Sequence, residues 1–170
     1  MKKDHWLLTV FILTFILSVT FSTISNILTI KVNEIVLSIV LVLVIIGGII
    51  FDIIGTSTIS AHESTFHALN AKKQKGARKA LIMIKNSNKI SSICNDIVGD
   101  VSGIISGAIG AVLSISLSTK FGLNNTITSI VIASLISSFT VGGKAIFKKY
   151  AMESADDILL FIAKRISIKN

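Results

Sequence analysis

Two aspartates lie four residues apart in a segment that is otherwise apolar enough to cross a bilayer. Asp96 and Asp100 share one face of a predicted helix, and a ladder of Gly99, Gly103 and Gly107 runs through the same segment. Ionisable side chains at membrane depth are costly and usually mark the path of an ion or a substrate. Small residues at every fourth position allow helices to pack closely. The segment therefore predicts an ion-binding helix.

The composition of the chain predicts a membrane protein rather than a soluble domain. Of the 170 residues, 51% are hydrophobic and 15% are charged, whereas soluble domains carry about 25% charged residues. The sequence contains no proline, which favours uninterrupted helices over a turn-rich β fold. Cys94 is the only cysteine, so we expect no intrachain disulfide and interpret it as a small packing residue.

Four apolar runs reach the length of about 20 residues that a spanning helix needs. The predicted spans cover about residues 6–25, 35–60, 90–118 and 126–143. The second run continues past Asp52 without another charge, so Asp52 would lie inside the membrane. The first run has a rival interpretation as a signal peptide starting at Lys2 and Lys3, although it is long for one and no clean cleavage site follows. We predict an all-α membrane protein with a single transmembrane domain over residues 1–170.

Two amphipathic helices are predicted beside the membrane, over about residues 62–86 and 154–167. The first carries six basic residues, and Lys89 follows it as a seventh; its apolar stripe is made of Phe66, Leu69, Ala77, Ala80, Leu81 and Ile84. Such a helix could lie at the inner membrane surface, or it could pack on its own protein. His62 and His67 are five residues apart, whereas a zinc-protease motif needs four, so both are expected at the surface.

The net charge of +8 is compatible with nucleic-acid binding, but the placement of the basic residues favours another reading. With four spans and a cytoplasmic N-terminus, every Lys and Arg except Lys31 and Lys120 falls on the cytoplasmic side. This is the pattern of loop charge in membrane proteins. We therefore predict a multi-pass protein of the inner cell membrane, with both termini cytoplasmic, in contact with the lipid bilayer and without a nucleic-acid partner.

Polar residues of three predicted spans lie at a similar depth. At a rise of about 1.5 Å per residue, Asp96 and Asp100 lie roughly 10 and 16 Å inward from Lys89, and Asp52 lies roughly 15 Å inward from His62. The fourth span adds hydroxyl groups near this depth, namely those of Ser134, Ser137, Ser138 and Thr140. Carboxylate and hydroxyl oxygens are the ligands that hard cations such as Mg²⁺ or Na⁺ prefer.

These polar residues have two other interpretations. The acids could be neutral, or paired with Lys144 and Asn95, and serve only to hold helices together. An enzyme is not expected, because no nucleophile, base and orienting group occur together in the sequence.

Two separated motifs resemble the membrane domain of the cyclin-M/CorC magnesium transporters. Gly76–Leu81 followed by Asn86–Ile90 resembles that family's Gly-x-x-x-Ala-Leu helix and its Asn-Pro-Asn-Arg-Phe-like entry to the next span. Gly143–Ala151 resembles its closing motif, Gly-Glu-x-x-Pro-Lys-x-x-Ala. The resemblance covers roughly residues 40–168, and the first span would be an addition to the family's three.

The resemblance implies a homodimer that holds a dehydrated Mg²⁺. By position it implies ligands in Gly55-Thr56-Ser57, in the region Asn95–Ser102, and in Gly142-Gly143-Lys144. Together with the aspartates, the expected metal site comprises Asp52, Ser57, Asn95, Asp96, Asp100, Ser102, Gly142 and Gly143, with Lys144 as a charge partner or gate.

The chain departs from the family at two positions of the closing motif. Lys144 replaces the family's Glu and Phe147 replaces its Pro, and a charged lysine cannot bind a cation. The nucleotide-sensing CBS pair and the C-terminal domain do not follow, so regulation by ATP is not expected. We predict a protein, dimeric through the glycine ladder, that binds and transports a divalent cation. The alternative is a non-transporting protein that interacts with or regulates a membrane-protein partner, its ion site closed by an Asp–Lys144 pair.

Overall fold

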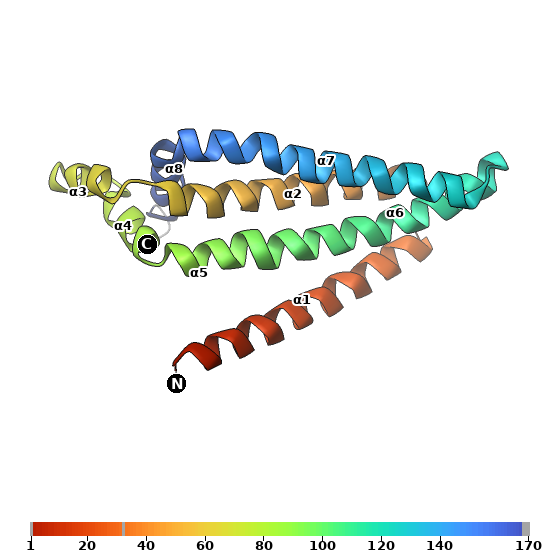
Figure 1. Cartoon of the computed structure of the whole chain (residues 1–170), viewed down its shortest axis with the longest axis horizontal. Helices are drawn as coiled ribbons and strands as arrows, with labels where there is room; N and C mark the ends of the chain where they lie inside the picture. The colour runs from red at the N-terminus through yellow and green to blue at the C-terminus, as the bar shows by residue number, and fades with distance from the viewer. Residues whose placement is uncertain (1, 32, 168–170) are drawn as a thin grey trace. The chain divides into compact units, whose positions relative to one another are not determined.

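The computed structural model describes residues 2–31 and 33–167, and all the secondary structure in these ranges is helical (Figure 1). In chain order the elements are α1 (Lys2–Lys31), α2 (Glu34–Ser60), α3 (Glu63–Ala71), α4 (Ala77–Lys85), α5 (Ser87–Ser91), the π-helix η1 (Ser92–Val98), α6 (Gly99–Phe121), α7 (Asn125–Glu153) and α8 (Ala155–Ser167). The helices α5, η1 and α6 follow one another without a break.

Three helical stretches are long and apolar enough to cross a membrane: Glu34–Ser60, Ser87–Phe121 and Asn125–Glu153. The span predicted over residues 6–25 falls on α1, where the described apolar stretch is Leu8–Thr20, and the structure does not show this helix as a span. The protein is therefore all-α with three candidate spans. This suggests a multi-pass membrane protein in contact with the lipid bilayer.

Contacts divide the chain into two compact units. The first unit comprises Met1–Gly48 and Ile97–Gly143, and the second comprises Ile49–Asp96 and Lys144–Asn170. Helices α2 and α7 contribute residues to both units. Each unit contains an apolar cluster of its own.

The core of the first unit forms around α6. Four of its apolar residues recur at every fourth position and are buried: Val101, Ile105, Ile109 and Leu113. Leu37 and Leu41 of α2 complete this cluster, and Leu17 of α1 packs against it. Gly110 allows α7 to approach α6, because a Cβ at this position would overlap Cδ1 of Ile136. The central position of α6 follows from this stripe of apolar residues.

Hydroxyl groups link α6 to α7 near the turn that joins them. The Oγ atoms of Ser114 and Ser129 are 2.9 Å apart, and Ser118 Oγ donates to Asn125 Oδ1 at 3.2 Å. The turn itself has Gly122 in the left-handed region at φ 64°, as a helix C-terminus favours. The oxygen Asn124 Oδ1 then accepts the backbone N–H of Thr126, which caps the start of α7.

The second unit contains a small apolar core between α3, α4 and α8. Its buried members are Phe66, Ala80, Leu81, Leu159 and Ala163. Figure 1 shows α4 beside α8. The apolar stripe predicted for residues 62–86 thus packs on the protein's own α8. A hydrogen bond supports this arrangement, since Asp156 Oδ1 of α8 accepts the backbone N–H of His62, just before α3, at 2.8 Å.

The helix expected over residues 62–86 is two helices, α3 and α4, separated by a turn. Lys73 and Gly76 take positive φ angles of 53° and 91° in this turn, which a continuing helix does not allow. A Cβ added at Gly76 would lie 2.9 Å from the backbone nitrogen of Lys164, so the turn packs directly on α8. The helix predicted over residues 154–167 is present as α8.

Candidate cation-binding site

The last turns of α2 bury a row of polar side chains in the second unit. Asp52 retains 8% of its accessible surface, Thr56 retains 5%, and Ser57 and Thr58 are fully buried. Asp52 and Thr56 are four residues apart and so lie on one face of the helix. Ser57 Oγ donates to the carbonyl oxygen of Ala151 in α7 at 3.2 Å. A buried acid and three buried hydroxyls thus share the end of a candidate span.

The π-helix η1 approaches this part of α2 at Gly55. A Cβ added at Gly55 would overlap Oδ1 of Asn95 and would lie 3.1 Å from Cβ of Cys94. Only a glycine allows the side chain of Asn95 to lie against the backbone of α2. The amide nitrogen Asn95 Nδ2 donates to Ser91 Oγ at 3.2 Å, which orients the amide. The oxygen of Asn95 is therefore the atom directed at Gly55.

π-helical turns are rare in proteins, and those that occur are often found at functional sites. In this chain such a turn covers Ser92–Val98 and carries both Cys94 and Asn95 toward α2. Because π-helical residues are wound more widely than α-helical ones, the turn changes which residues of the segment face inward. Within the turn Ile97 is buried, whereas Asp96 is exposed.

Two buried side-chain oxygens lack a hydrogen-bond partner among the described residues: Thr56 Oγ1 and Asn95 Oδ1. A neighbouring residue shows that this is not a general property of threonines in this helix. Thr58 Oγ1 donates to the carbonyl oxygen of Ile54 at 2.7 Å, which satisfies it within α2. Leaving a buried polar atom unpaired costs about 1–3 kcal/mol, so such atoms usually contact an ion or a water molecule.

The predicted acids do not form a carboxylate cluster. Asp96 and Asp100 are exposed, whereas Asp52 is buried. Among the side chains that the structure describes, no three of His, Cys, Asp or Glu lie close enough together to hold a metal ion. Any cation site in this region would therefore consist mainly of neutral oxygens around a single carboxylate.

The other predicted ligands lie in the first unit, and the predicted charge partner lies in the second. Asp100, Ser102, Gly142 and Gly143 belong to the first unit, where a Cβ at Gly48 would lie 3.0 Å from Cβ of Ser102. Lys144 belongs to the second unit and is half-buried. It forms no ion pair with any residue that the structure describes, Asp52 and Asp96 included.

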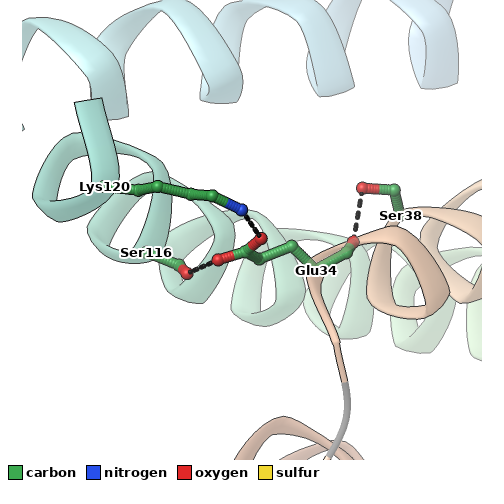
Figure 2. Close-up of polar contacts among 4 residues, drawn as sticks. All are labelled: Glu34, Ser38, Ser116 and Lys120. Atoms are coloured by element: carbon green, nitrogen blue, oxygen red, sulfur yellow. Dashed lines mark hydrogen bonds and ion pairs between the residues drawn. The ribbon is translucent and has the colours of Figure 1, made fainter.

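A second polar cluster, which the sequence analysis missed, lies in the first unit (Figure 2). Glu34 Oε1 accepts a hydrogen bond from Ser116 Oγ, and Oε2 accepts one from Lys120 Nζ, each at 2.7 Å. Ser38 Oγ donates to the backbone carbonyl of Glu34 at 2.9 Å. The cluster fixes the start of α2 against the end of α6. The sequence does indicate this pair, since Glu34 and Lys120 carry opposite charges and lie at the ends of two predicted spans.

Comparisons of the chain with protein-family models, with curated proteins and with solved structures found no match. The resemblance to the cyclin-M/CorC membrane domain therefore stays a prediction from the two sequence motifs. Arguments about function rest on the geometry of the two clusters.

Proposed function

We propose that the protein binds a divalent cation such as Mg²⁺ in its second unit and transports it across the cytoplasmic membrane. The observation that carries the proposal is a pair of buried oxygens without a described hydrogen-bond partner, Thr56 Oγ1 and Asn95 Oδ1, at the contact of α2 with η1. Asp52 is buried one turn from Thr56 and supplies a negative charge on the same helix face. This combination suits a hard cation.

Each residue has a distinct role in the proposed site. Asp52 provides the charged oxygen, and Thr56 and Asn95 provide neutral oxygens. Ser57 contributes a hydroxyl oxygen whose proton is directed to Ala151. Mg²⁺ usually keeps several water ligands, so three or four protein oxygens suffice. Exposed Asp96 attracts cations toward the site, and Lys144, which is not paired with Asp52 or Asp96, acts as the gate.

We further propose four spans with cytoplasmic termini, with α1 as the additional span, and a homodimer formed through the glycine ladder. Support for the dimer comes from a groove of about 300 Å³ in the first unit. Small residues dominate its lining, including Gly103, Gly107, Ala133 and Ser137. A Cβ at Gly103 or Gly107 would meet no atom within 4 Å, so a second helix has room to approach.

Flux into liposomes that contain a Mg²⁺-sensitive dye tests the transport proposal. Asp52→Asn should lower Mg²⁺ affinity and flux by about 100-fold or more, because even residues outside the coordination sphere contribute 10–100-fold at metal sites. Asp157→Asn is the matched control, since Asp157 is an exposed acid of α8 in the same unit. Equal flux for the intact protein and both variants would refute the proposal.

The same experiment addresses the alternative of a non-transporting regulatory protein. That alternative requires a closed site, for which an ion pair of Lys144 with Asp52 or Asp96 would be the expected sign. Absence of flux in the intact protein, together with capture of a stoichiometric membrane-protein partner, would replace transport by this alternative.

A further inference from the structure

The outward face of α4 combines two cations with an exposed apolar residue. Arg78, Ile82 and Lys85 follow one another at spacings of four and three residues, so they lie on one side of the helix. All three are exposed, and Ile82 retains 54% of its accessible surface. The adjoining side, with Ala77, Ala80 and Leu81, is buried against the rest of the second unit. The outward face is thus not used in the packing of the protein.

The positive charge of this region is not neutralised by the described part of the chain. Arg78 and Lys85 form no ion pair with a described residue, and the same holds for the exposed lysines of the preceding turn, Lys72, Lys73 and Lys75. Between residues 61 and 86 the only acid is Glu63. Glu63 lies in α3, and its carboxylate is 3.4 Å from Nε2 of His67 in the same helix. The cations of α4 are therefore available to an external anion.

The position of α4 in the chain places it near a bilayer surface. The candidate span in α2 ends at Ser60, and the next candidate span begins at Ser87, two residues after α4 ends. With nine residues and a rise of about 1.5 Å per residue, α4 is roughly 14 Å long. Lys85 therefore lies near the headgroup layer, and Arg78 lies about two helical turns further along.

We propose that this outward face of α4, defined as Arg78, Ile82 and Lys85, binds anionic phospholipid headgroups. The guanidinium of Arg78 and the ammonium of Lys85 match headgroup phosphates, and Ile82 between them enters the boundary between headgroups and acyl chains. The abundance of basic residues in this unit assigns it to the cytoplasmic side, where the leaflet is anionic. A surface for RNA would be expected to add aromatic side chains for stacking, and this face has none.

This proposal is independent of cation transport, because none of its residues belongs to the proposed cation site. The test uses the full chain in neutral detergent, with a fluorescent phosphatidylglycerol or phosphatidylcholine titrated into the micelles. The variant R78Q/K85Q removes two charges from the outward face. The control variant K72Q/K73Q removes two charges from the exposed turn, so the net charge of the two variants is the same.

We expect the intact protein to prefer phosphatidylglycerol at low salt. Each basic residue near an anionic surface contributes about a five-fold change in affinity, so R78Q/K85Q should bind phosphatidylglycerol roughly thirty-fold more weakly. K72Q/K73Q should change the affinity by less than about five-fold. I82S should weaken binding without changing its salt dependence, since it removes apolar contact only.

Three results would overturn the proposal: equal affinity for the two lipids, equal losses in the two charge variants, or displacement of the lipid by inorganic phosphate or a short RNA at comparable concentration. Equal melting temperatures of the intact protein and R78Q/K85Q establish that a loss of binding is not a loss of folding.

Discussion

The two polar clusters of this protein differ in whether their hydrogen-bonding capacity is used. In the first unit, both carboxylate oxygens of Glu34 accept hydrogen bonds, from Ser116 and Lys120. In the second unit, Thr56 Oγ1 and Asn95 Oδ1 are buried without a described partner. A satisfied cluster holds helices in place, whereas an unsatisfied one is a position where an ion or water binds. This difference is the basis for proposing a structural role for the first cluster and a binding role for the second.

The largest effect is expected from filling the space at Gly55, beside the cluster of Thr56 and Asn95, here called the binding cluster. Gly55→Ala should destabilise the protein by about 1–3 kcal/mol and abolish cation binding, because the new methyl group overlaps Asn95 Oδ1. Chemical denaturation and Mg²⁺ titration of the purified protein measure the two effects.

A second glycine of the same helix provides the control. A Cβ at Gly47 would meet no atom within 4 Å, so Gly47→Ala should leave Mg²⁺ affinity unchanged. Its stability should stay the same or rise by up to about 1 kcal/mol, since alanine is the better helix former. Similar effects of the two substitutions would show that the contact at Gly55 is not special.

The next test acts on the satisfied cluster. Glu34→Gln weakens the hydrogen bonds from Ser116 and Lys120, so the unfolding temperature should fall while Mg²⁺ affinity stays the same. The effect should be smaller than that of Gly55→Ala, because the side chains of this pair are partly exposed, 28% for Glu34 and 58% for Lys120.

A double-mutant cycle with Lys120→Met isolates the ion pair. If the pair stabilises the start of α2, the double variant should lose less unfolding temperature than the sum of the losses in the two single variants. Full additivity, or a loss of Mg²⁺ affinity in Glu34→Gln, would remove the distinction between the two clusters.

The helices were largely predictable because they depend on local patterns. Runs of apolar residues predicted spans over 35–60, 90–118 and 126–143, where the structure has candidate spans. The helix α7 continues to Glu153 because Lys144 does not end a helix by itself, and no proline or glycine follows it. Helix breaks were harder to predict. The turn between α3 and α4 depends on the contact of Gly76 with α8, which is distant in sequence.

The site was less predictable, since its features depend on contacts between helices. Ser57 and Asn95 entered the candidate site through motif spacing, and the structure places both in the second unit. The exposure of Asp96 and the role of Gly55 follow from the π-helical turn at Ser92–Val98, for which the sequence carries no breaker residue. The pair of Glu34 and Lys120 joins residues 86 positions apart, beyond the range of any local pattern.

The finest test compares two threonines of one helical segment. Thr58 Oγ1 donates to Ile54 within α2, so Thr58→Val should cost about 1 kcal/mol of stability through the lost hydrogen bond and leave Mg²⁺ affinity unchanged. Thr56 Oγ1 has no described partner, so Thr56→Val in the absence of divalent cations should be neutral or stabilising by up to about 1 kcal/mol. With Mg²⁺ present, the same variant should gain less stability from the ion than the intact protein does.

The sign of the difference between the two variants decides the role of the binding cluster. Chemical denaturation with and without Mg²⁺ measures it, and valine preserves the shape of threonine in both. If Thr56→Val destabilises the ion-free protein as much as Thr58→Val does, the hydroxyl of Thr56 already has a partner such as a bound water. In that case the cluster is satisfied in the same way as that of Glu34, and its assignment as a cation site loses its main support.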